Sequence, residues 1–330
     1  MNLTTEQKSW FYTLQRPWPL VQRPLEVIAH PLGTTETALI DFIQALRTAG
    51  YIRRIGGVFD ARRLGYRSCL FGIHAPSNAD LERVSEAVTA LPGVTHAYTR
   101  GWPKDLELDG VTEKDYHAYP NFWYTLSAPA THFDDTAAQL AAFNPIPFPA
   151  LKRYKIDVVF DLRTRSRDER TEYVSPQLTA APTLLNATQQ DIVRRYQDDT
   201  LDYTAPFRTE DLPQLQAWQA DGTMRRFALL LYHRVTGFMA NGMCCWQVPI
   251  EAIDHHGRLL AAQPEVTHCY ARPENEKFPF TLYAMIHNTS WEAAYDTFNQ
   301  LTRRAELDSF ARKIFFSTHE YKKSSLRFFI

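Results

Sequence analysis

Histidine is the residue type in this sequence that could move a proton near neutral pH, and four of the eleven histidines stand in distinctive settings. His117 precedes an aromatic run in HAYPNFWYTL, and His233 follows the apolar run FALLLY. His96 and His268 each occur in a Val-Thr-His-x-Tyr pattern that is typical of a strand. A carboxylate-rich ligand would raise the pKa of a histidine, which could then act as an acid at pH 7. We take these four as candidate proton donors, in that order, with a structural hydrogen-bonding role as the alternative for the last two.

Arginine pairs mark two places where a polyanion could bind. Residues 53–67 carry five arginines against one aspartate, and residues 225–234 carry three arginines and no acid. Arginine grips carboxylates and phosphates through paired hydrogen bonds. Both segments suit a ligand with several carboxylates, and the alternative is a solvated surface. The candidate binding arginines are Arg53, Arg54, Arg63, Arg226 and Arg234.

Other residues suit a flat ligand. Gly56 and Gly57 interrupt a strand pattern, and glycine there marks either a bulge or a place where another group approaches the backbone. Trp123 could wall an apolar face, although such side chains more often belong to the core. Tyr98 is a further candidate for ligand contact. The sequence has no Walker loop, Gly-x-Gly-x-x-Gly, Gly-x-Ser-x-Gly or His-Glu-x-x-His pattern, so nucleotide, acyl-transfer and zinc-protease chemistry lack support.

The composition excludes several classes of protein. With 45% hydrophobic and 22% charged residues, the chain has a globular composition. Its net charge of −1 gives no overall field to attract DNA. The four cysteines form no Cys-x-x-Cys pair, which argues against a structural metal site and favours a reducing compartment. Without a signal-like start or a long apolar run, we expect a cytoplasmic protein with no membrane partner.

The segments that carry the candidate residues are repeated along the chain. PGVTHAYTR at 92–100 recurs as PEVTHCYAR at 264–272, and Arg53-Arg54 recurs as Arg225-Arg226. The spacing is the same for both, since 264 − 92 and 225 − 53 equal 172. One spacing shared by two distant segments indicates a tandem duplication.

Each copy reads as two helices and a β-ribbon, followed by a strand-helix-strand-strand-helix-strand order. In the first copy the helix at 35–49 ends before Gly50, and strands at 51–59 and 66–74 flank an ARRLG turn. We predict an α+β fold, a tandem repeat of a winged helix-turn-helix and a ferredoxin-like domain, with the halves packed through their sheets as a pseudo-dimer. The predicted domains are 1–60 and 187–235 (winged helix), 61–165 and 236–330 (ferredoxin-like), with a linker at 166–186.

These motifs resemble one branch of the Lrp/AsnC group, the siroheme decarboxylases. The first copy resembles their D-type subunit and the second their L-type subunit, so the chain resembles a natural D–L fusion. Its one departure is an insertion at 101–116. The matching runs of the first copy are RRIGGVFDARRLGY at 53–66, VTHAY at 94–98 and HAYPNFWYTL at 117–126. Those of the second are RRFALLLYHRVTGFMANGMCCWQVP at 225–249, VTHCYARP at 266–273 and PFTLYAMIHN at 279–288.

The resemblance implies removal of CO2 from two acetate side chains of siroheme, on rings C and D. The product would be didecarboxysiroheme, on the route to heme d1 or to heme. No external cofactor is expected, because protonation of the ring itself creates the electron sink and iron arrives with the substrate. His117 or His233 could instead be an axial ligand of that iron. Other proteins of heme d1 biosynthesis and a second copy of the chain are the expected partners besides siroheme.

Two other functions stay open at this level. A DNA-binding regulator would need cations on the second helix of each helix-turn-helix. TETALIDFIQALRTA has one arginine against two acids, and TEDLPQLQAWQAD has no cation, so we expect no DNA binding. A tetrapyrrole-binding protein without turnover would share every binding feature and differ only in an assay.

Overall fold

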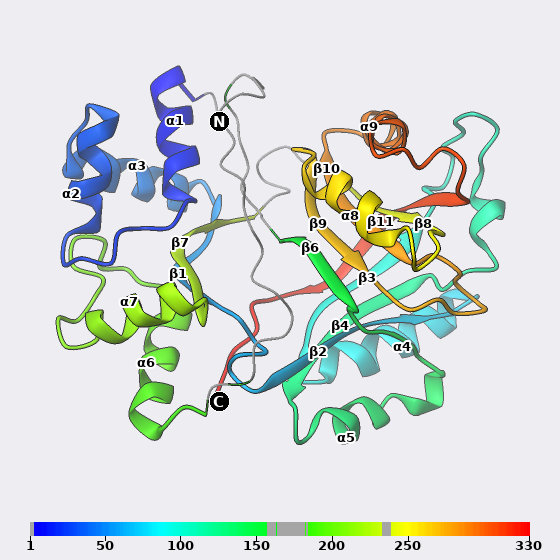
Figure 1. Ribbon diagram of the computed structural model, residues 1–330, viewed down its shortest axis with the longest axis horizontal. Coiled ribbons are helices and arrows are strands. Elements are labelled where there is room, and N and C mark those ends of the chain that lie inside the picture. The colour runs from blue at the N-terminus through cyan, green and yellow to red at the C-terminus, as the bar shows by residue number, and fades with distance from the viewer. Residues whose placement is uncertain (1–2, 157–162, 164–181, 183, 233–238) are drawn as a thin grey trace.

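The computed structural model describes residues 3–156, 163, 182, 184–232 and 239–330, which form a helical body beside a larger β-sheet body (Figure 1). The helical body gathers the helix-turn-helix parts of both repeats around one hydrophobic core. Its elements are α1 (Thr5–Leu14), α2 (Pro24–Ala29), α3 (Glu36–Thr48), α6 (Ala187–Gln197), α7 (Leu212–Asp221), β1 (Ile52–Phe59) and β7 (Met224–Leu231).

Local sequence sets the ends of these helices. Thr4 caps α1 in a reciprocal capping box with Gln7, and Thr35 accepts a hydrogen bond from the backbone of Ala38 at the start of α3. Gly50, with a φ of +74°, follows α3, as the sequence predicted for the stop of that helix. The short helix α2 was not predicted; it begins at Pro24, whose fixed φ suits a first helical position.

The predicted β-ribbon is wrong in its pairing. Strands form at both predicted places, but β1 pairs antiparallel with β7 of the other repeat, and β2 (Tyr66–Ile73) joins the large sheet. The register places Ile55 opposite Leu229 and Gly57 opposite Phe227. Because each β1-like strand finds its partner in the other copy, the two Arg-Arg pairs come to lie on one two-stranded ribbon, named here the wing ribbon (β1 and β7).

The β-sheet body contains nine strands among the described residues, in the order β5-β2-β4-β3-β11-β8-β10-β9-β6. Within each half, the order is that of a ferredoxin-like sheet, as predicted. The first half provides β2, β3 (Val94–Gly101), β4 (Phe122–Pro129) and β5 (Ile146–Phe148). The second provides β8 (Ala240–Trp246), β9 (Val266–Ala271), β10 (Leu282–Asn288) and β11 (Arg312–Lys323). The last strand, β6 (Lys152–Ile156), comes from the first half but pairs with β9.

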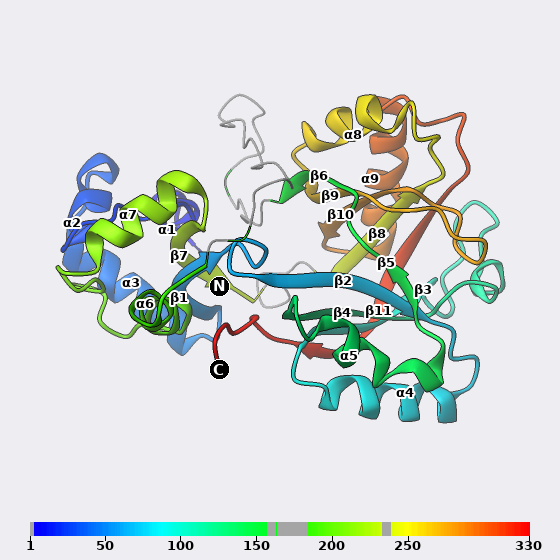
Figure 2. The ribbon, with the colours of Figure 1, turned by 60° about the horizontal axis from the view of Figure 1, so that its bottom comes forward.

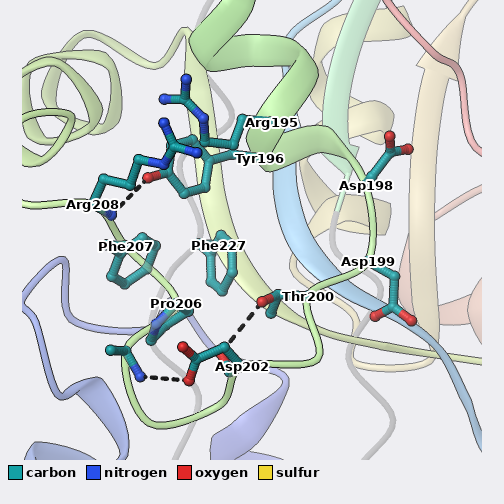
Figure 3. A pocket seen from close by; sticks show the side chains of 11 residues that line it. Arg195, Tyr196, Asp198, Asp199, Thr200, Asp202, Pro206, Phe207, Arg208 and Phe227 are labelled. Carbon is teal, nitrogen blue, oxygen red and sulfur yellow. Dashed lines mark hydrogen bonds between the residues drawn. The ribbon is translucent and has the colours of Figure 1, made fainter.

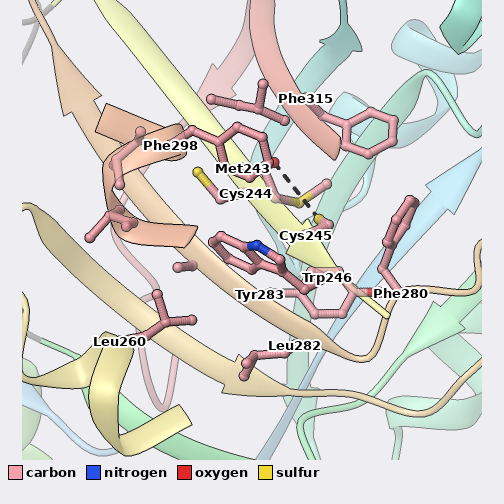
Figure 4. Packing of buried hydrophobic residues seen from close by; sticks show 14 of the residues in the cluster. Met243, Cys244, Cys245, Trp246, Leu260, Phe280, Leu282, Tyr283, Phe298 and Phe315 are labelled. Atoms are coloured by element: carbon pink, nitrogen blue, oxygen red, sulfur yellow. Dashed lines mark hydrogen bonds between the residues drawn. The ribbon is translucent and has the colours of Figure 1, made fainter. Parts of the chain in front are cut away.

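Four helices cover the outer faces of this sheet (Figure 2). The first half carries α4 (Asn78–Ala90) and α5 (Phe133–Ala138), and the second carries α8 (Ile253–Ala261) and α9 (Trp291–Arg304). Each pair buries an apolar stripe against its own half. In the second half, Trp246 of β8 lies 5.3 Å from the ring of Phe298 on α9 (Figure 4). The opposite face of the sheet is thereby left to face the wing ribbon.

The two halves join along their strand edges, and aromatic side chains of both halves also share one core. The rings of Trp123 and Phe148 in the first half lie 5.0 and 5.5 Å from that of Phe278 in the second. Strand β11 pairs with β8 through residues 312–316 and with β3 through residues 316–323. Strand β11 extends beyond the end of β8. The backbone groups of its second part would be unpaired there, and they form hydrogen bonds with β3 of the first half instead. Backbone hydrogen bonds between the repeats therefore make one continuous sheet.

The chain passes from one body to the other at a short turn. Strand β1 ends at Phe59 in the helical body, and β2 begins at Tyr66 in the sheet. The predicted linker, residues 166–186, lies outside the described residues except for Pro182 and 184–186. Among the helices that the structure describes, none has the length and apolar character needed to cross a membrane.

Candidate active site

A cavity of about 580 Å³ lies between the wing ribbon and the inner face of the large sheet. Both repeats line it: β1 and β7 from the helical body, and β2, β3, β4, β8, β9 and β10 from the sheet. It therefore exists only because the two halves are assembled in one molecule.

The cavity is strongly cationic. Among the described residues that line it there is no aspartate or glutamate. The net charge of the whole chain is −1, so the positive charge is concentrated at this place. Such a cavity is built for an anion with several negative groups. The cationic lining residues are Arg16, Arg53, Arg54, Arg100, Arg225, Arg226, Arg272 and Lys323.

Residues related by the repeat face the cavity in pairs. His96, Tyr98 and Arg100 occupy alternate positions of β3, and side chains alternate between the faces of a strand, so the three share the cavity side. The second copy places the corresponding residues on β9 and just after it. They are His268, Tyr270 and Arg272. Arg53 and Arg54 of β1 pair in the same way with Arg225 and Arg226 of β7.

The surroundings that the protein provides keep the two repeated histidines neutral at pH 7. Burial, with smaller contributions from the charges of Lys323 and Arg53, lowers the pKa of His96 to about 3. Burial, with a smaller contribution from the charge of Arg225, lowers the pKa of His268 to about 4. The carboxylates that we expect to raise these pKa values belong to the ligand, and the described residues that line the cavity include no acid that would do so.

Hydrogen bonds fix which nitrogen of His268 can transfer a proton. The hydroxyl of Thr267 donates to the carbonyl of Met285 at 3.1 Å, and its oxygen lies 3.2 Å from Nδ1 of His268. Since that hydroxyl hydrogen is already used, Nδ1 carries a hydrogen and donates to Thr267. Nε2 is then the basic nitrogen that gains and loses the transferable proton. In the first copy, Nδ1 of His96 lies 2.9 Å from the hydroxyl of Thr95.

Several arginines of the cavity have buried donor atoms with no hydrogen-bond partner. Arg100 is 8% exposed, and neither its Nε nor its Nη1 has a partner among the described residues. Burial lowers its pKa, and the ring of Tyr98 lies 5.1 Å away from its guanidinium carbon. Its repeat counterpart Arg272 donates to the carbonyl of Phe148. An unpaired buried guanidinium is costly, and a bound carboxylate would satisfy it.

Aromatic and thioether side chains form the apolar part of the wall. Trp123 and Tyr283 hold equivalent places on β4 and β10, opposite Tyr98 and Tyr270 in the strand register. Trp123 is fully buried, and its indole donates to the carbonyl of Pro120 at 2.9 Å. These groups, with Met243 and Met285, suit a flat apolar ligand with a charged rim.

The structure brings together seven of the residues singled out in the sequence and leaves four outside the cavity. Two more, His233 and Arg234, lie outside the described residues. The residues in the cavity are His96, His268, Arg53, Arg54, Arg226, Tyr98 and Trp123. The residues that do not line it are His117, Arg63, Gly56 and Gly57.

His117 was ranked first among the acids, and the geometry does not support that rank. It is exposed at the end of a short 3-10 helix (Glu113–Tyr116), and this insertion packs instead against the core of the second half through Trp102 and Tyr116. Arg63 lies in the turn between β1 and β2, away from the lining residues. The sequence shows the motifs that contain His117 and Arg63, but it does not show whether the loops that carry them reach the cavity.

The Gly56-Gly57 pair is explained by close packing within the protein, and no ligand is needed to account for it. A Cβ atom on Gly56 would lie 2.4 Å from the carbonyl oxygen of Asp198 and 2.6 Å from Nη1 of Arg54. A Cβ on Gly57 would lie 3.1 Å from the carbonyl oxygen of Tyr196. The group that approaches this backbone is therefore the end of α6, together with the side chain of Arg54 folded back over the strand.

Some lining residues were missed although the sequence held a signal for them. Arg100 and Arg272 close the repeated motif from which the two histidines were taken, and Tyr270 is the counterpart of Tyr98. The shared spacing would have identified all three. The repeat spacing does not identify the other missed residues, because the tertiary arrangement of distant segments brings them to the cavity. They are His287, Lys323 and Arg16.

A second cavity, of about 370 Å³, lies in the helical body beside α6 (Figure 3). Its acidic residues include Asp198 and Asp199, which are paired with Arg327 and Arg47. It is unsuited to a polycarboxylate. Within the described ranges, no cluster of three or more histidines, cysteines or acids could hold a metal ion.

These features define a fused tandem protein of the AsnC-like class with a polyanion-binding cavity between its halves. Residues 12–53 match the model of the siroheme decarboxylase NirDL-like HTH domain, and residues 235–322 match that of the AsnC-like ligand binding domain. The siroheme decarboxylase of Hydrogenobacter thermophilus is 30% identical over 328 residues, covering 96% of this chain and 92% of that protein. The chain belongs to the siroheme decarboxylase family.

Two further similarities bear on the cavity and on the duplication. The crystal structure of the siroheme decarboxylase NirDL in complex with an iron-uroporphyrin III analogue matches 97% of this chain and 93% of its own, with 26% identity and a TM-score of 0.67. The siroheme decarboxylase beta subunit of Methanosarcina barkeri is 36% identical over 118 residues, which are 36% of this chain and 76% of that subunit. One repeat of this chain is thus similar to a separate subunit elsewhere.

Proposed function

We propose that this chain removes CO2 from two acetate side chains of siroheme, on rings C and D, and gives didecarboxysiroheme for the synthesis of heme d1 or heme. The observation that carries the proposal is the cavity itself, with eight cations, aromatic walls and two half-buried histidines. Its cationic rim complements a tetrapyrrole ringed by carboxylates, and its walls complement the flat faces. We also place the reaction in the cytoplasm, where the four free thiols stay reduced.

Each decarboxylation consumes one proton. Protonation of the pyrrole makes the ring an electron sink, and the C–C bond to the acetate carboxylate breaks. Its electron pair moves into the ring, and CO2 leaves. The exocyclic methylene then takes a proton to become a methyl group, and the ring gives up the proton that it gained. The protein has to supply protons and a desolvated site for the reacting carboxylate.

We assign the acid role to His96 and His268. The protein's own surroundings keep them neutral, and the carboxylates of a bound substrate would raise their pKa. Binding of the substrate therefore loads the protons that the reaction uses, in His268 at Nε2. The iron belongs to the substrate, and heme d1 proteins and a second copy of the chain stay as predicted partners.

The test is anaerobic incubation with siroheme and mass analysis for the loss of two CO2. We expect His96→Ala and His268→Ala each to slow turnover by about 10²–10⁴-fold while substrate binding largely survives. In the wild type, kcat should fall as the pH rises through the raised pKa of the donor. Siroheme binding should take up protons, measured by calorimetry in buffers of different ionisation enthalpy.

The control is a pair of arginine variants. Arg54→Gln should weaken binding, and Arg63→Gln should behave as wild type because Arg63 does not line the cavity. Near-wild-type turnover in both histidine variants would exclude the histidine acids and direct attention to Tyr98. Tight binding without any loss of mass would favour a tetrapyrrole-binding protein without turnover.

A further inference from the structure

The segment that follows β11, residues 324–329, connects the two bodies at the rim of the cavity and is named here the strap. It leaves the sheet where Lys323 lies opposite His96 in the β11–β3 register. The backbone N–H of Ser324 then donates to the carbonyl of Thr95 at 2.8 Å. The strap therefore starts beside one of the cavity histidines.

The far end of the strap is held in the core of the helical body. Phe328 is 4% exposed, and its ring lies 5.0 Å from that of Tyr66 and 6.3 Å from that of Phe59. The buried side chain of Gln197 makes two hydrogen bonds to the backbone of Phe328, donating to its carbonyl at 3.1 Å and accepting from its N–H at 2.6 Å. The N–H of Phe329 donates to the hydroxyl of Tyr66 at 2.8 Å. A segment anchored at both ends has a fixed path between them.

Ser325, the second residue of the strap, contacts Arg54, a cationic residue of the cavity. Nε of Arg54 donates to the hydroxyl oxygen of Ser325 at 3.2 Å, and Nη2 donates to the carbonyl of Gly57 at 3.1 Å. Nη1 of Arg54 is buried and has no hydrogen-bond partner among the described residues. Gly56 leaves the room in which this guanidinium folds back over the ribbon, since a Cβ there would lie 2.6 Å from Nη1.

We propose that Ser325 is a positioning residue, through which the strap fixes the guanidinium of Arg54 for a carboxylate of the tetrapyrrole. This inference rests on the proposed function for the identity of the ligand. Two of the donor atoms of Arg54 are held by the protein, so its guanidinium has a fixed place in the wall of the cavity. Fixing a long side chain before binding removes an entropic cost that binding would otherwise carry.

The test measures binding of iron-uroporphyrin III by absorbance titration, with siroheme turnover measured separately. Ser325→Ala should raise the Kd about three- to tenfold, the ratio expected for one lost hydrogen bond, and leave kcat at saturating siroheme near the wild-type value. Ser325→Thr keeps the hydroxyl and should restore binding. Arg327→Gln is the matched control, because the ion pair of Arg327 with Asp198 lies at the surface of the same segment.

A double variant separates positioning of Arg54 from a general effect on folding. In the Arg54→Gln background, Ser325→Ala should change the Kd no further, because its only action is through Arg54. A wild-type Kd for Ser325→Ala, or fully additive effects of the two substitutions, would overturn the proposal. Absence of siroheme turnover in the wild type would instead contradict the proposed function, and the titration would still test the strap.

Discussion

At the scale of one residue, Arg100 is expected to lower the stability of the ligand-free protein and to strengthen binding of the ligand. Its guanidinium is buried, and two of its nitrogens have no partner among the described residues. Replacing a buried charge by an apolar side chain of similar size is often neutral or stabilising. The same charge is what a ligand carboxylate would meet. Stability and binding should therefore respond in opposite directions to its removal.

We predict that Arg100→Met raises the free energy of unfolding by about 1–3 kcal/mol and weakens tetrapyrrole binding by roughly tenfold or more. Urea unfolding of the ligand-free protein and absorbance titration measure the two effects. Arg272→Met is the matched control. Its guanidinium donates to Phe148 and lies over the rings of Tyr270 and Tyr283, so its removal should not stabilise the protein. A less stable Arg100→Met protein would contradict this account.

At the scale of the element, the helix-turn-helix units contribute to the ligand-binding cavity. The wing strands β1 and β7 pair with each other and present their arginines to the cavity. In α3, the only arginine, Arg47, is already engaged: it makes two hydrogen bonds to the carboxylate of Asp199, at 2.7 and 3.0 Å, and one to the hydroxyl of Tyr203. The predicted second helix of the other unit, α7, has no cation.

We therefore expect no sequence-specific DNA binding, because neither helix offers a free cation for phosphates. A gel shift with random and genomic duplexes at about 150 mM salt checks this. Arg47→Gln, which removes the ion pair with Asp199, should leave the result unchanged. Retention of one duplex against excess competitor would reopen the regulator hypothesis.

At the scale of the whole molecule, fusion of two repeats makes one cavity from two half-sites. Each half supplies one histidine, one tyrosine and one arginine of the repeated motif, together with an Arg-Arg pair. Contacts between the halves run along β1–β7, β3–β11 and β6–β9. The covalent connection is thus only one of several links between them.

We predict that the chain still assembles when it is expressed as two polypeptides divided between residues 170 and 171. The two should co-purify, and the complex should bind iron-uroporphyrin III with an affinity near that of the intact chain. Each polypeptide alone should bind far more weakly, because it holds half of the cations. Separate elution of the two polypeptides on size exclusion would show that the strand pairs are too weak to hold the halves together.

Sequence alone was sufficient for features that depend on near neighbours. The caps and apolar spacing predicted helices such as α3 and α4, and strand alternation placed His96, Tyr98 and Arg100 on one face. The 172-residue repeat predicted two equivalent sets of residues. The motifs were specific enough to identify the family, which the relatives confirm.

Only the tertiary structure decided which strands are neighbours and which loops reach the cavity. Alternation tells which side chains share a face, but the pairing of β1 with β7 and of β11 with β3 joins segments far apart in the chain, and local pattern carries no record of it. For the same reason His117, in a promising motif, lies at the surface. The lowered pKa of His96 likewise follows only from the tertiary structure, because desolvation depends on what the assembled halves enclose.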